Sequence, residues 1–281
     1  MHAKILAIAN KKGGTGKSTM AVNLAAELGW RGHRVLVADI DPQGHAGLGF
    51  GIGATDEAKT IHFALRRPDA DLAAAILPTS EPGVDVLAAD RNFDGQVRLG
   101  DPRCLARALD RIRPHYDLVL IDTPPAAANV MVCVLLACDG VLAPTLLDHL
   151  SLDGVRQFAR SYHHVVVKLQ AALLGLAIAP MLVDFRSNMQ KLVLAQLTSG
   201  FGTGQVMRGV RVDVSVAEAF ACGRPLRRYR PDTRAVADFC AVADDVIRRF
   251  NLPALTPAGD QAAALAAAVS AGRLEERRAP L

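Results

Sequence analysis

The chain has 281 residues, of which 51% are hydrophobic and 5% aromatic, and its formal net charge is +4. This length suits one α/β domain with a full core, and the composition suits a Val, Ile and Leu sheet covered by Ala-rich helices. The five cysteines form no C-x-x-C pair, which argues against disulfides, a zinc site or an iron–sulfur cluster. The longest apolar runs, 126–138 and 171–183, are too short to span a bilayer, and the chain start leaves no room for a signal. We therefore expect a soluble cytoplasmic protein.

Strand-like and helix-like stretches alternate along the chain. Strands are expected at 5–9, 35–39, 84–88, 118–122, 141–145 and 174–183. Helices are expected at 18–30, 104–113, 129–137, 152–169, 189–197 and 236–250. This rhythm predicts an α/β fold, a mostly parallel twisted sheet with helices on both faces. The carboxyl ends of the strands then meet at one edge, where such folds bind their ligands.

The first expected strand runs into a glycine-rich stretch and then into a helix, which is the context of a phosphate-binding P-loop. Backbone N–H groups and the positive end of the helix favour phosphate there. Lys17 is expected to reach the β- and γ-phosphates of a nucleotide, and the Ser18 hydroxyl to ligate Mg²⁺. The residues expected to hold the nucleotide are Lys12, Gly13, Gly14, Thr15, Gly16, Lys17, Ser18 and Thr19.

Two lysines distinguish this loop from the standard G-x-x-x-x-G-K-[ST] pattern, because Lys11 replaces the first glycine and Lys12 adds a charge inside the loop. The stretch resembles the deviant Walker A loop, K-G-G-x-G-K-[ST], of the ParA/MinD family of P-loop ATPases. The resemblance implies that Lys12 crosses to the nucleotide bound by a partner subunit. Two facing nucleotides would then hold an ATP-dependent homodimer, with Lys12 and Lys17 both contributing to catalysis.

Two acidic residues follow the second expected strand, Asp39 and Asp41, in a stretch that reads D-I-D-P-Q-G. Carboxylates at a strand end are placed to face a nucleotide, and the Pro and Gly predict a switch loop after them. The stretch resembles the D-x-D-P-Q-G segment of ParA-like ATPases. The resemblance implies that Asp41 positions or activates the attacking water and that Asp39 lies nearer the water shell of the metal. A turn with two structural aspartates is the alternative.

The fourth expected strand ends in Asp122, after four apolar residues, and Thr123-Pro124-Pro125 follows it. This is a Walker B pattern, in which a buried strand holds a carboxylate for Mg²⁺. The next residues match the family's D-x-P-P switch II, whose backbone senses the γ-phosphate. The predicted metal site therefore consists of Ser18, Asp39 and Asp122.

The resemblance extends over about residues 4–250, so the chain is expected to consist of one ParA-like P-loop ATPase domain, 1–250. An Ala-rich tail or weakly docked helix is expected at 251–281. The stretch 206–214 departs from the I-P-R-N-like segment of the family, which tends to supply adenine contacts. Asp184 and Asp213 are the candidates for these contacts, with a place in a surface loop as the alternative for each. The eight histidines have no metal-ligand spacing and are expected on the surface or in the core.

Basic residues outnumber acidic ones between 184 and 234, which indicates either a solvated surface or a surface for a nucleic acid backbone. DNA is preferred because arginines cluster in the C-terminal half of the chain, and the resemblance implies that the binding is non-specific. Arg234 matches a basic position that the family uses on DNA. The candidate DNA contacts are Arg208, Arg211, Arg227, Arg228, Arg230 and Arg234.

The resemblance implies a partition ATPase that positions a plasmid or chromosome and associates with the nucleoid when bound to ATP. Its hydrolysis would be slow until a ParB-like partner stimulates it, because no arginine near the motifs is positioned as a finger in cis. One alternative is a MinD-like ATPase on a membrane, for which the Ala-rich 260–281 offers little apolar area, so no membrane partner is expected. A second is a ParA-like ATPase with a protein cargo, and a third is a metallocluster carrier, which would need paired cysteines.

Overall fold

The computed structural model describes residues 3–53, 59–67, 71–93, 101–125, 128–169, 173–253 and 255. The strands in this part of the chain are β1 (Lys4–Ile8), β2 (Val35–Asp39), β3 (Leu77–Pro78), β4 (Val84–Leu87), β5 (Leu118–Asp122), β6 (Gly140–Leu146), β7 (Leu176–Val183) and β8 (Val210–Arg211). The helices are α1 (Lys17–Trp30), α2 (His45–Gly49), α3 (Ile61–Arg66), α4 (Cys104–Ile112), α5 (Ala128–Ala137), α6 (His149–Leu169), α7 (Asn188–Phe201), α8 (Val214–Ala221), α9 (Leu226–Tyr229) and α10 (Arg234–Arg249).

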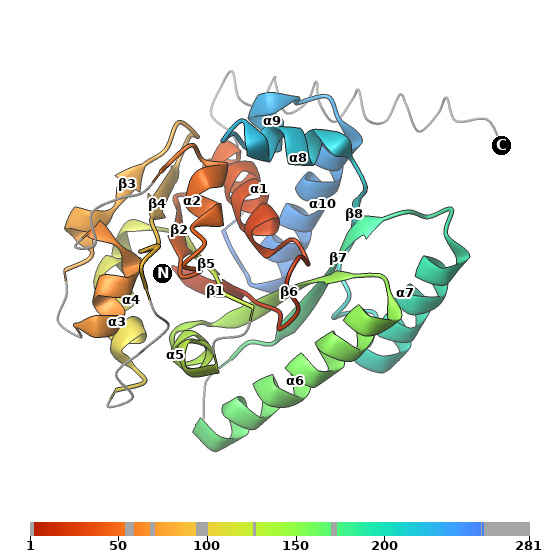
Figure 1. Cartoon of the computed structure of the whole chain (residues 1–281), viewed down its shortest axis with the longest axis horizontal. Coiled ribbons are helices and arrows are strands. Elements are labelled where there is room, and N and C mark those ends of the chain that lie inside the picture. Colours follow the sequence, from red (N-terminus) through yellow and green to blue (C-terminus); the bar gives the residue numbers. More distant parts are fainter. Residues whose placement is uncertain are drawn as a thin grey trace.

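The strands form a single sheet in the order β3-β4-β2-β5-β1-β6-β7-β8. Every pair in it is parallel except β3 with β4. Parallel strands of this kind need cover on both faces, because their side chains are apolar on both. Figure 1 shows α1, α8, α9 and α10 on one side of the sheet and α5 and α6 on the other. The predicted α/β fold is confirmed.

The central strands send alternate side chains into two cores. Ile5 and Ala7 of β1 pack into the core that α4, α5 and α6 cover, and Leu6 and Ile8 pack into the core that α1 and α10 cover. All four side chains are completely buried. Burial of an aliphatic side chain stabilises a fold by about 1.5–3 kcal/mol, so β1 is held firmly from both faces.

The expected strands are all present, and those at 35–39 and 118–122 have the predicted bounds. Helix α6 begins three residues earlier than predicted, because the side chain of Asp148 caps it by accepting a hydrogen bond from the backbone N–H of Ser151. The elements that sequence periodicity missed are short: α2, α3, α8, α9, β3 and β8. The tail expected at 251–281 lies outside the described residues, except for 251–253 and 255.

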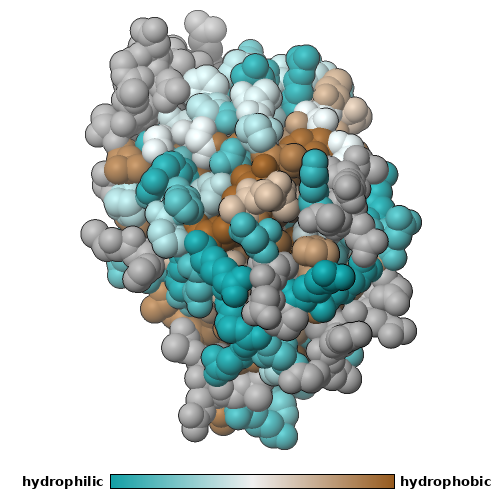
Figure 2. Space-filling view, turned by 90° about the vertical axis from the view of Figure 1, so that its left-hand side faces the viewer, coloured by the Kyte–Doolittle hydropathy of each residue, from teal (hydrophilic) through white to brown (hydrophobic). Residues whose placement is uncertain are grey.

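Figure 2 shows the side of the molecule on which β3, β4, α3 and α4 lie. Hydrophilic residues cover much of its described surface, and hydrophobic ones gather near the middle. Such a mixture is ordinary for a folded domain, which never has enough polar surface to cover itself. None of the helices in the described part of the chain has the length and apolar character to cross a bilayer.

Candidate active site

The central strands end level with one another at one edge of the sheet. In the register of the sheet, Ile8 of β1 and Asp39 of β2 are both paired with Asp122 of β5. The loop after β1 leaves at this edge and leads straight into α1, whose first residue is Lys17. The structure therefore brings the predicted phosphate-binding loop and the predicted metal-binding carboxylates together from three separate segments.

The phosphate-binding loop is shaped by Gly14 and Gly16, whose φ angles of 69° and 87° lie in the left-handed region. A Cβ atom on Gly13 or Gly14 would meet nothing within 4 Å, so open space lies over the loop there. Helix α1 has no side-chain cap and no acidic residue in its first turn. Its first N–H groups therefore remain available to an anion such as a phosphate.

The other loop residues secure the backbone. Thr15 is almost completely buried, and its hydroxyl donates to the carbonyl of Lys12 over 3.4 Å. The carbonyl of Thr19 accepts a hydrogen bond of 2.9 Å from the side chain of Asn23 in α1. These contacts help to hold the loop and the start of α1 in shape.

Lys17 and Asp122 lie in the buried part of the site, where each influences the charge of the other. Burial lowers the pKa of the Lys17 ammonium group, while Asp122 and Asp41 act to raise it. Burial raises the pKa of Asp122 to about 7, although the Ser18 hydroxyl and Lys17 act to lower it. A polyphosphate beside the lysine and a cation beside the carboxylate would both favour the charged forms.

The carboxylate of Asp122 fits a divalent metal ion. Both of its oxygens are buried, and neither accepts a hydrogen bond of normal geometry from the described residues. Asp39 lies beside it, and burial together with Asp122 raises the pKa of Asp39. No three His, Cys, Asp or Glu side chains in the described ranges form a metal centre by themselves. Mg²⁺ needs no such centre, since one or two carboxylates suffice when phosphates and waters supply the other oxygens. Ser18 and Asp122 would hold it, whereas the two carboxylate oxygens of Asp39 accept hydrogen bonds from the backbone N–H groups of Asp41 and Gly47.

Asp41 lies on the turn that follows β2 and is 7% exposed. One of its carboxylate oxygens accepts a hydrogen bond of 3.0 Å from the backbone N–H of Gln43. The backbone carbonyl of Asp41 accepts a second hydrogen bond, of 2.8 Å, from the N–H of Gly44. The φ angle of Gly44 is 65°, in the left-handed region that favours glycine. The turn places Asp41 near enough to Lys17 for its charge to act to raise the pKa of that lysine. Its action on water remains a prediction.

Lys12 lies on the accessible side of the loop and contacts α6 of its own chain. Its Nζ is 3.2 Å from both carboxylate oxygens of Asp148 and 2.8 Å from the hydroxyl of Ser151. About a third of each partner in the ion pair remains exposed. The lysine is thus partly open to solvent, and its crossing to a partner subunit remains a prediction.

Sequence reasoning missed two residues that organise the loop, Asn10 and Asp148. The Asn10 amide donates to the carbonyl of Pro144 over 2.8 Å and to the Thr145 hydroxyl over 3.2 Å, and it accepts from the N–H of Lys12. Asp148 caps α6 and binds Lys12. The only sequence signal for Asn10 is an uncharged polar residue between an apolar strand and the loop, which many proteins share.

Asp213 is the N-cap of α8, and its carboxylate accepts a hydrogen bond of 3.0 Å from the N–H of Ser215. This gives it a local structural role at the start of the helix. Its contact with adenine is left as a prediction.

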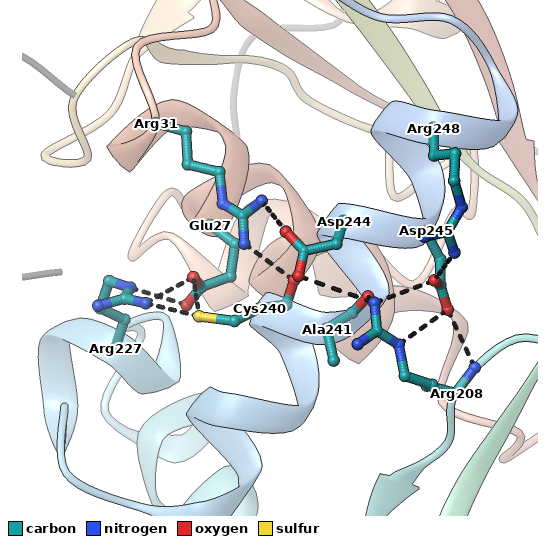
Figure 3. A network of polar contacts seen from close by, with 9 residues as sticks. All are labelled: Glu27, Arg31, Arg208, Arg227, Cys240, Ala241, Asp244, Asp245 and Arg248. Carbon is teal, nitrogen blue, oxygen red and sulfur yellow. Dashed lines mark hydrogen bonds and ion pairs between the residues drawn. The ribbon is translucent and has the colours of Figure 1, made fainter. Parts of the chain in front are cut away.

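The candidate DNA-binding arginines fall into two groups. Those of the first group form ion pairs of 3.0 Å or less, and those of the second do not. Arg227 is 6% exposed and forms two hydrogen bonds, of 2.8 and 2.7 Å, with Glu27 of α1, and Cys240 of α10 adjoins them (Figure 3). A buried, paired guanidinium cannot bind a DNA phosphate, so the prediction for Arg227 is wrong. Arg208 pairs with Asp245 over 3.0 Å, as Figure 3 also shows, and Arg211 pairs with Asp238 over 2.7 Å.

The remaining candidates, Arg228, Arg230 and Arg234, are exposed, as is the ion-paired Arg208. Arg228 lies 3.6 Å from the buried carboxylate of Glu81. Arg230 donates to the hydroxyl of Ser215, and Arg234 donates to the carbonyl of Val212. Within the described ranges, neither Arg230 nor Arg234 has a carboxylate partner, and the same holds for Arg224. These three keep their charge available.

The chain matches the family described as AAA domain over residues 3–174, which is more than half of its length. It is 33% identical to the chromosome partitioning protein ParA of Caulobacter vibrioides over 88% of this chain and 94% of that protein. It is 32% identical to the sporulation initiation inhibitor protein Soj of Bacillus subtilis over 86% of this chain and 98% of that protein.

Among solved structures, the septum site-determining protein MinD of Pyrococcus horikoshii, complexed with Mg-ADP, superposes with a TM-score of 0.71. The alignment has 24% identity and covers 87% of this chain and 96% of that one, a likeness that concerns the fold. The loop, the carboxylates at the strand ends and these relatives agree on an ATPase with ATP and Mg²⁺ as its cofactors. The chain belongs to the ParA/Soj-type P-loop ATPases of the AAA domain family.

Proposed function

We propose that this chain is a partition ATPase whose ATP-bound homodimer binds DNA without sequence preference and lets go after partner-stimulated hydrolysis. The observation that carries the proposal is the position of Lys12, which stands on the open side of the phosphate loop with about a third of its side chain exposed. Lys17, in contrast, is buried beside Asp122. One lysine therefore serves the nucleotide of its own subunit, and the other remains for the nucleotide of a partner.

The residues of the site divide the work of hydrolysis. Lys17 and the N–H groups at the start of α1 bind and orient the phosphates. The carboxylate of Asp41 accepts a hydrogen bond from the attacking water and directs it toward the γ-phosphate. Ser18 and Asp122 would hold Mg²⁺, which would supply a positive charge to offset that of the phosphates. Lys12 of the second subunit completes the neutralisation, so hydrolysis depends on the dimer.

Arg224, Arg230 and Arg234 support DNA as the ligand of the dimer. Arg224 lies between α8 and α9, Arg230 directly follows α9 and Arg234 begins α10, and among the described residues none of the three has a carboxylate partner. Arginine binds phosphate oxygens with a planar fork of donors, and such contacts carry no sequence information. Relatives with names that refer to chromosome partitioning make a chromosome or plasmid the preferred cargo and a ParB-like protein the preferred activator.

The first experiment addresses hydrolysis. Asp41→Ala should bind ATP and dimerise as the wild type does but hydrolyse ATP at least tenfold more slowly, since it loses the group that orients water. Size-exclusion chromatography with ATP and a phosphate-release assay measure the two properties. Wild-type turnover in the variant, or a variant that stays monomeric with ATP, contradicts the assigned role.

The second experiment addresses DNA in a mobility-shift assay with ATP. Arg230→Glu and Arg234→Glu should each weaken DNA binding about tenfold or more and leave ATP-dependent dimerisation intact. Arg103→Glu is the matched control, because it makes the same charge change at an exposed position beside α4, away from these helices. Equal losses in all three variants, or wild-type binding to anionic vesicles instead of DNA, would overturn the proposed DNA surface.

A further inference from the structure

A buried histidine, His62, lies directly behind the loop that carries Asp41. It is the second residue of α3 and is completely buried. Its Nδ1 accepts a hydrogen bond of 2.9 Å from the backbone N–H of Asp90, and its Nε2 lies 3.0 Å from the carbonyl oxygen of Ile40. Because Nδ1 accepts, the proton of the neutral ring is on Nε2 and is donated to Ile40. Burial lowers the pKa of His62 to about 4, which keeps the ring neutral at pH 7.

The ring has little freedom to turn. It stacks on Phe93 with a centroid distance of 4.1 Å and an interplanar angle of 30°. The backbone that bonds to Nδ1 is also fixed, because the buried carboxylate of Asp90 pairs with Arg66 over 3.1 Å and accepts from the N–H of Asn92 over 2.9 Å. Both the tautomer and the orientation of His62 are therefore set by its surroundings.

The carbonyl that receives this hydrogen bond belongs to the peptide unit between Ile40 and Asp41. The N–H of the same unit, from Asp41, donates to a carboxylate oxygen of Asp39 over 3.2 Å. One residue earlier, the N–H of Ile40 donates to the carbonyl of Asp122 over 2.9 Å. His62 on one side and Asp39 on the other thus fix the plane of the peptide from which the Asp41 side chain departs.

We propose that His62 is a positioning residue for ATP hydrolysis, which acts by holding the Ile40–Asp41 peptide and so the direction of the Asp41 carboxylate. The inference rests on the role of Asp41 proposed above. A group that orients a reacting water has to be placed within a fraction of an ångström, and small displacements lower the rate strongly. Nucleotide binding uses the loop after β1 instead, which His62 does not touch. The rate of hydrolysis should therefore depend on His62 while ATP affinity does not.

Two substitutions separate the hydrogen bond from the space that the ring fills. His62→Phe retains an aromatic ring against Phe93 and removes both hydrogen bonds. His62→Gln keeps an N–H donor near the position of Nε2. We expect kcat to fall about tenfold in the Phe variant, with KM for ATP within twofold of wild type, and the Gln variant to recover most of the rate. Wild-type kcat in His62→Phe, or parallel losses of rate and ATP affinity in both variants, would overturn the proposal.

A double substitution tests whether His62 acts through Asp41. In the Asp41→Ala background, His62→Phe should leave the residual rate unchanged, whereas an independent catalytic effect would lower it further. If Asp41→Ala alone hydrolyses ATP at the wild-type rate, the proposed function of Asp41 fails, and that result differs from a failure confined to His62.

The wild-type protein gives a measurement that requires no variant to fold. Nitrogen-15 NMR of the histidine ring should show a proton on Nε2 and none on Nδ1 between pH 6 and pH 8. A ring that is protonated on Nδ1 in this range would contradict the hydrogen bond to Ile40.

Discussion

The two lysines of the phosphate loop differ in burial, and this difference decides what each can do. Lys17 is buried among carboxylates, whereas Lys12 is about one-third exposed and paired with Asp148. We expect Lys17→Ala to lose ATP binding and Lys12→Ala to bind ATP but remain monomeric. Isothermal titration calorimetry and size-exclusion chromatography check the two expectations. Equal losses of ATP affinity in both variants would make Lys12 an ordinary ligand of its own nucleotide.

His62 also has a consequence for stability at low pH. Its pKa is about 4 in the folded protein, because burial disfavours the charged ring, and about 6.5 when unfolded. The unfolded state therefore binds more protons between these values, so stability is lost as the pH falls through this window. His62→Gln removes this titration. Between pH 7 and pH 4.5 the variant should lose about 2 kcal/mol less stability than the wild type in urea unfolding; identical losses would contradict the lowered pKa.

The sequence was most informative about residues whose role depends on local geometry. The sequence predicts a phosphate-binding role for Lys17, because an apolar strand and a glycine-rich turn precede it. It predicts a metal-binding role for Asp122, because that residue ends a buried strand. The burial of each arginine, and the carboxylate with which it pairs, could not be predicted from its neighbours in the sequence. Arg227 and Arg228 are neighbours in the sequence, yet one is buried with Glu27 from α1 and the other is exposed near Glu81. Their partners come from segments far away along the chain.

At the scale of elements, the helix that starts at the phosphate loop is joined to the C-terminal helices by polar contacts. Glu27 of α1, Arg227 of α9 and Cys240 of α10 meet in one buried group, and Arg31 after α1 pairs with Asp244 of α10 over 2.6 Å (Figure 3). Removing one partner of a buried ion pair leaves the other charge without compensation.

We therefore expect Arg227→Ala to destabilise the fold by about 3–5 kcal/mol, since Glu27 would stay buried and unpaired. The ion pair of Arg186 with Asp184 is the control, because Arg186 is 91% exposed. Arg186→Ala should leave the melting temperature essentially unchanged. Thermal unfolding measured by circular dichroism compares the two, and similar melting temperatures for both variants would show that the buried group does not stabilise the fold.

The long elements could be predicted and the short ones could not, for a physical reason. β2 and β5 are each a run of four apolar residues that ends in an aspartate, a pattern that indicates a buried strand, and their bounds were predicted. β8 has two residues, and α8 is fixed by the Asp213 cap and by packing of Ala219 and neighbours against the α1 side of the sheet. Neither has enough residues to show a period in the sequence.

At the scale of the whole molecule, the proposed DNA surface predicts a salt dependence. If Arg224, Arg230 and Arg234 of each subunit, which have no carboxylate partner among the described residues, each contact one phosphate, a dimer makes six phosphate contacts. Each contact releases about 0.9 counterion from duplex DNA, so a plot of log affinity against log salt should have a slope of about −5. Filter binding with ATP across a salt series measures it. A slope near −10 would indicate that the ion-paired arginines bind DNA as well.

If Lys12 crosses to a partner subunit as proposed, its contact with Asp148 and Ser151 in the monomer opposes dimer formation. A symmetric dimer has to release two such contacts at once, so whatever one contact contributes enters the association constant squared. An ion pair with about a third of each side chain exposed is worth only about 0.5 kcal/mol, and two of them correspond to about a fivefold change. Asp148→Asn, which keeps an oxygen to cap α6, should lower the dimer dissociation constant with ATP by about that factor in analytical ultracentrifugation. The strength of the Lys12–Asp148 contact in the monomer would then help to set the protein concentration at which ATP first causes dimer formation.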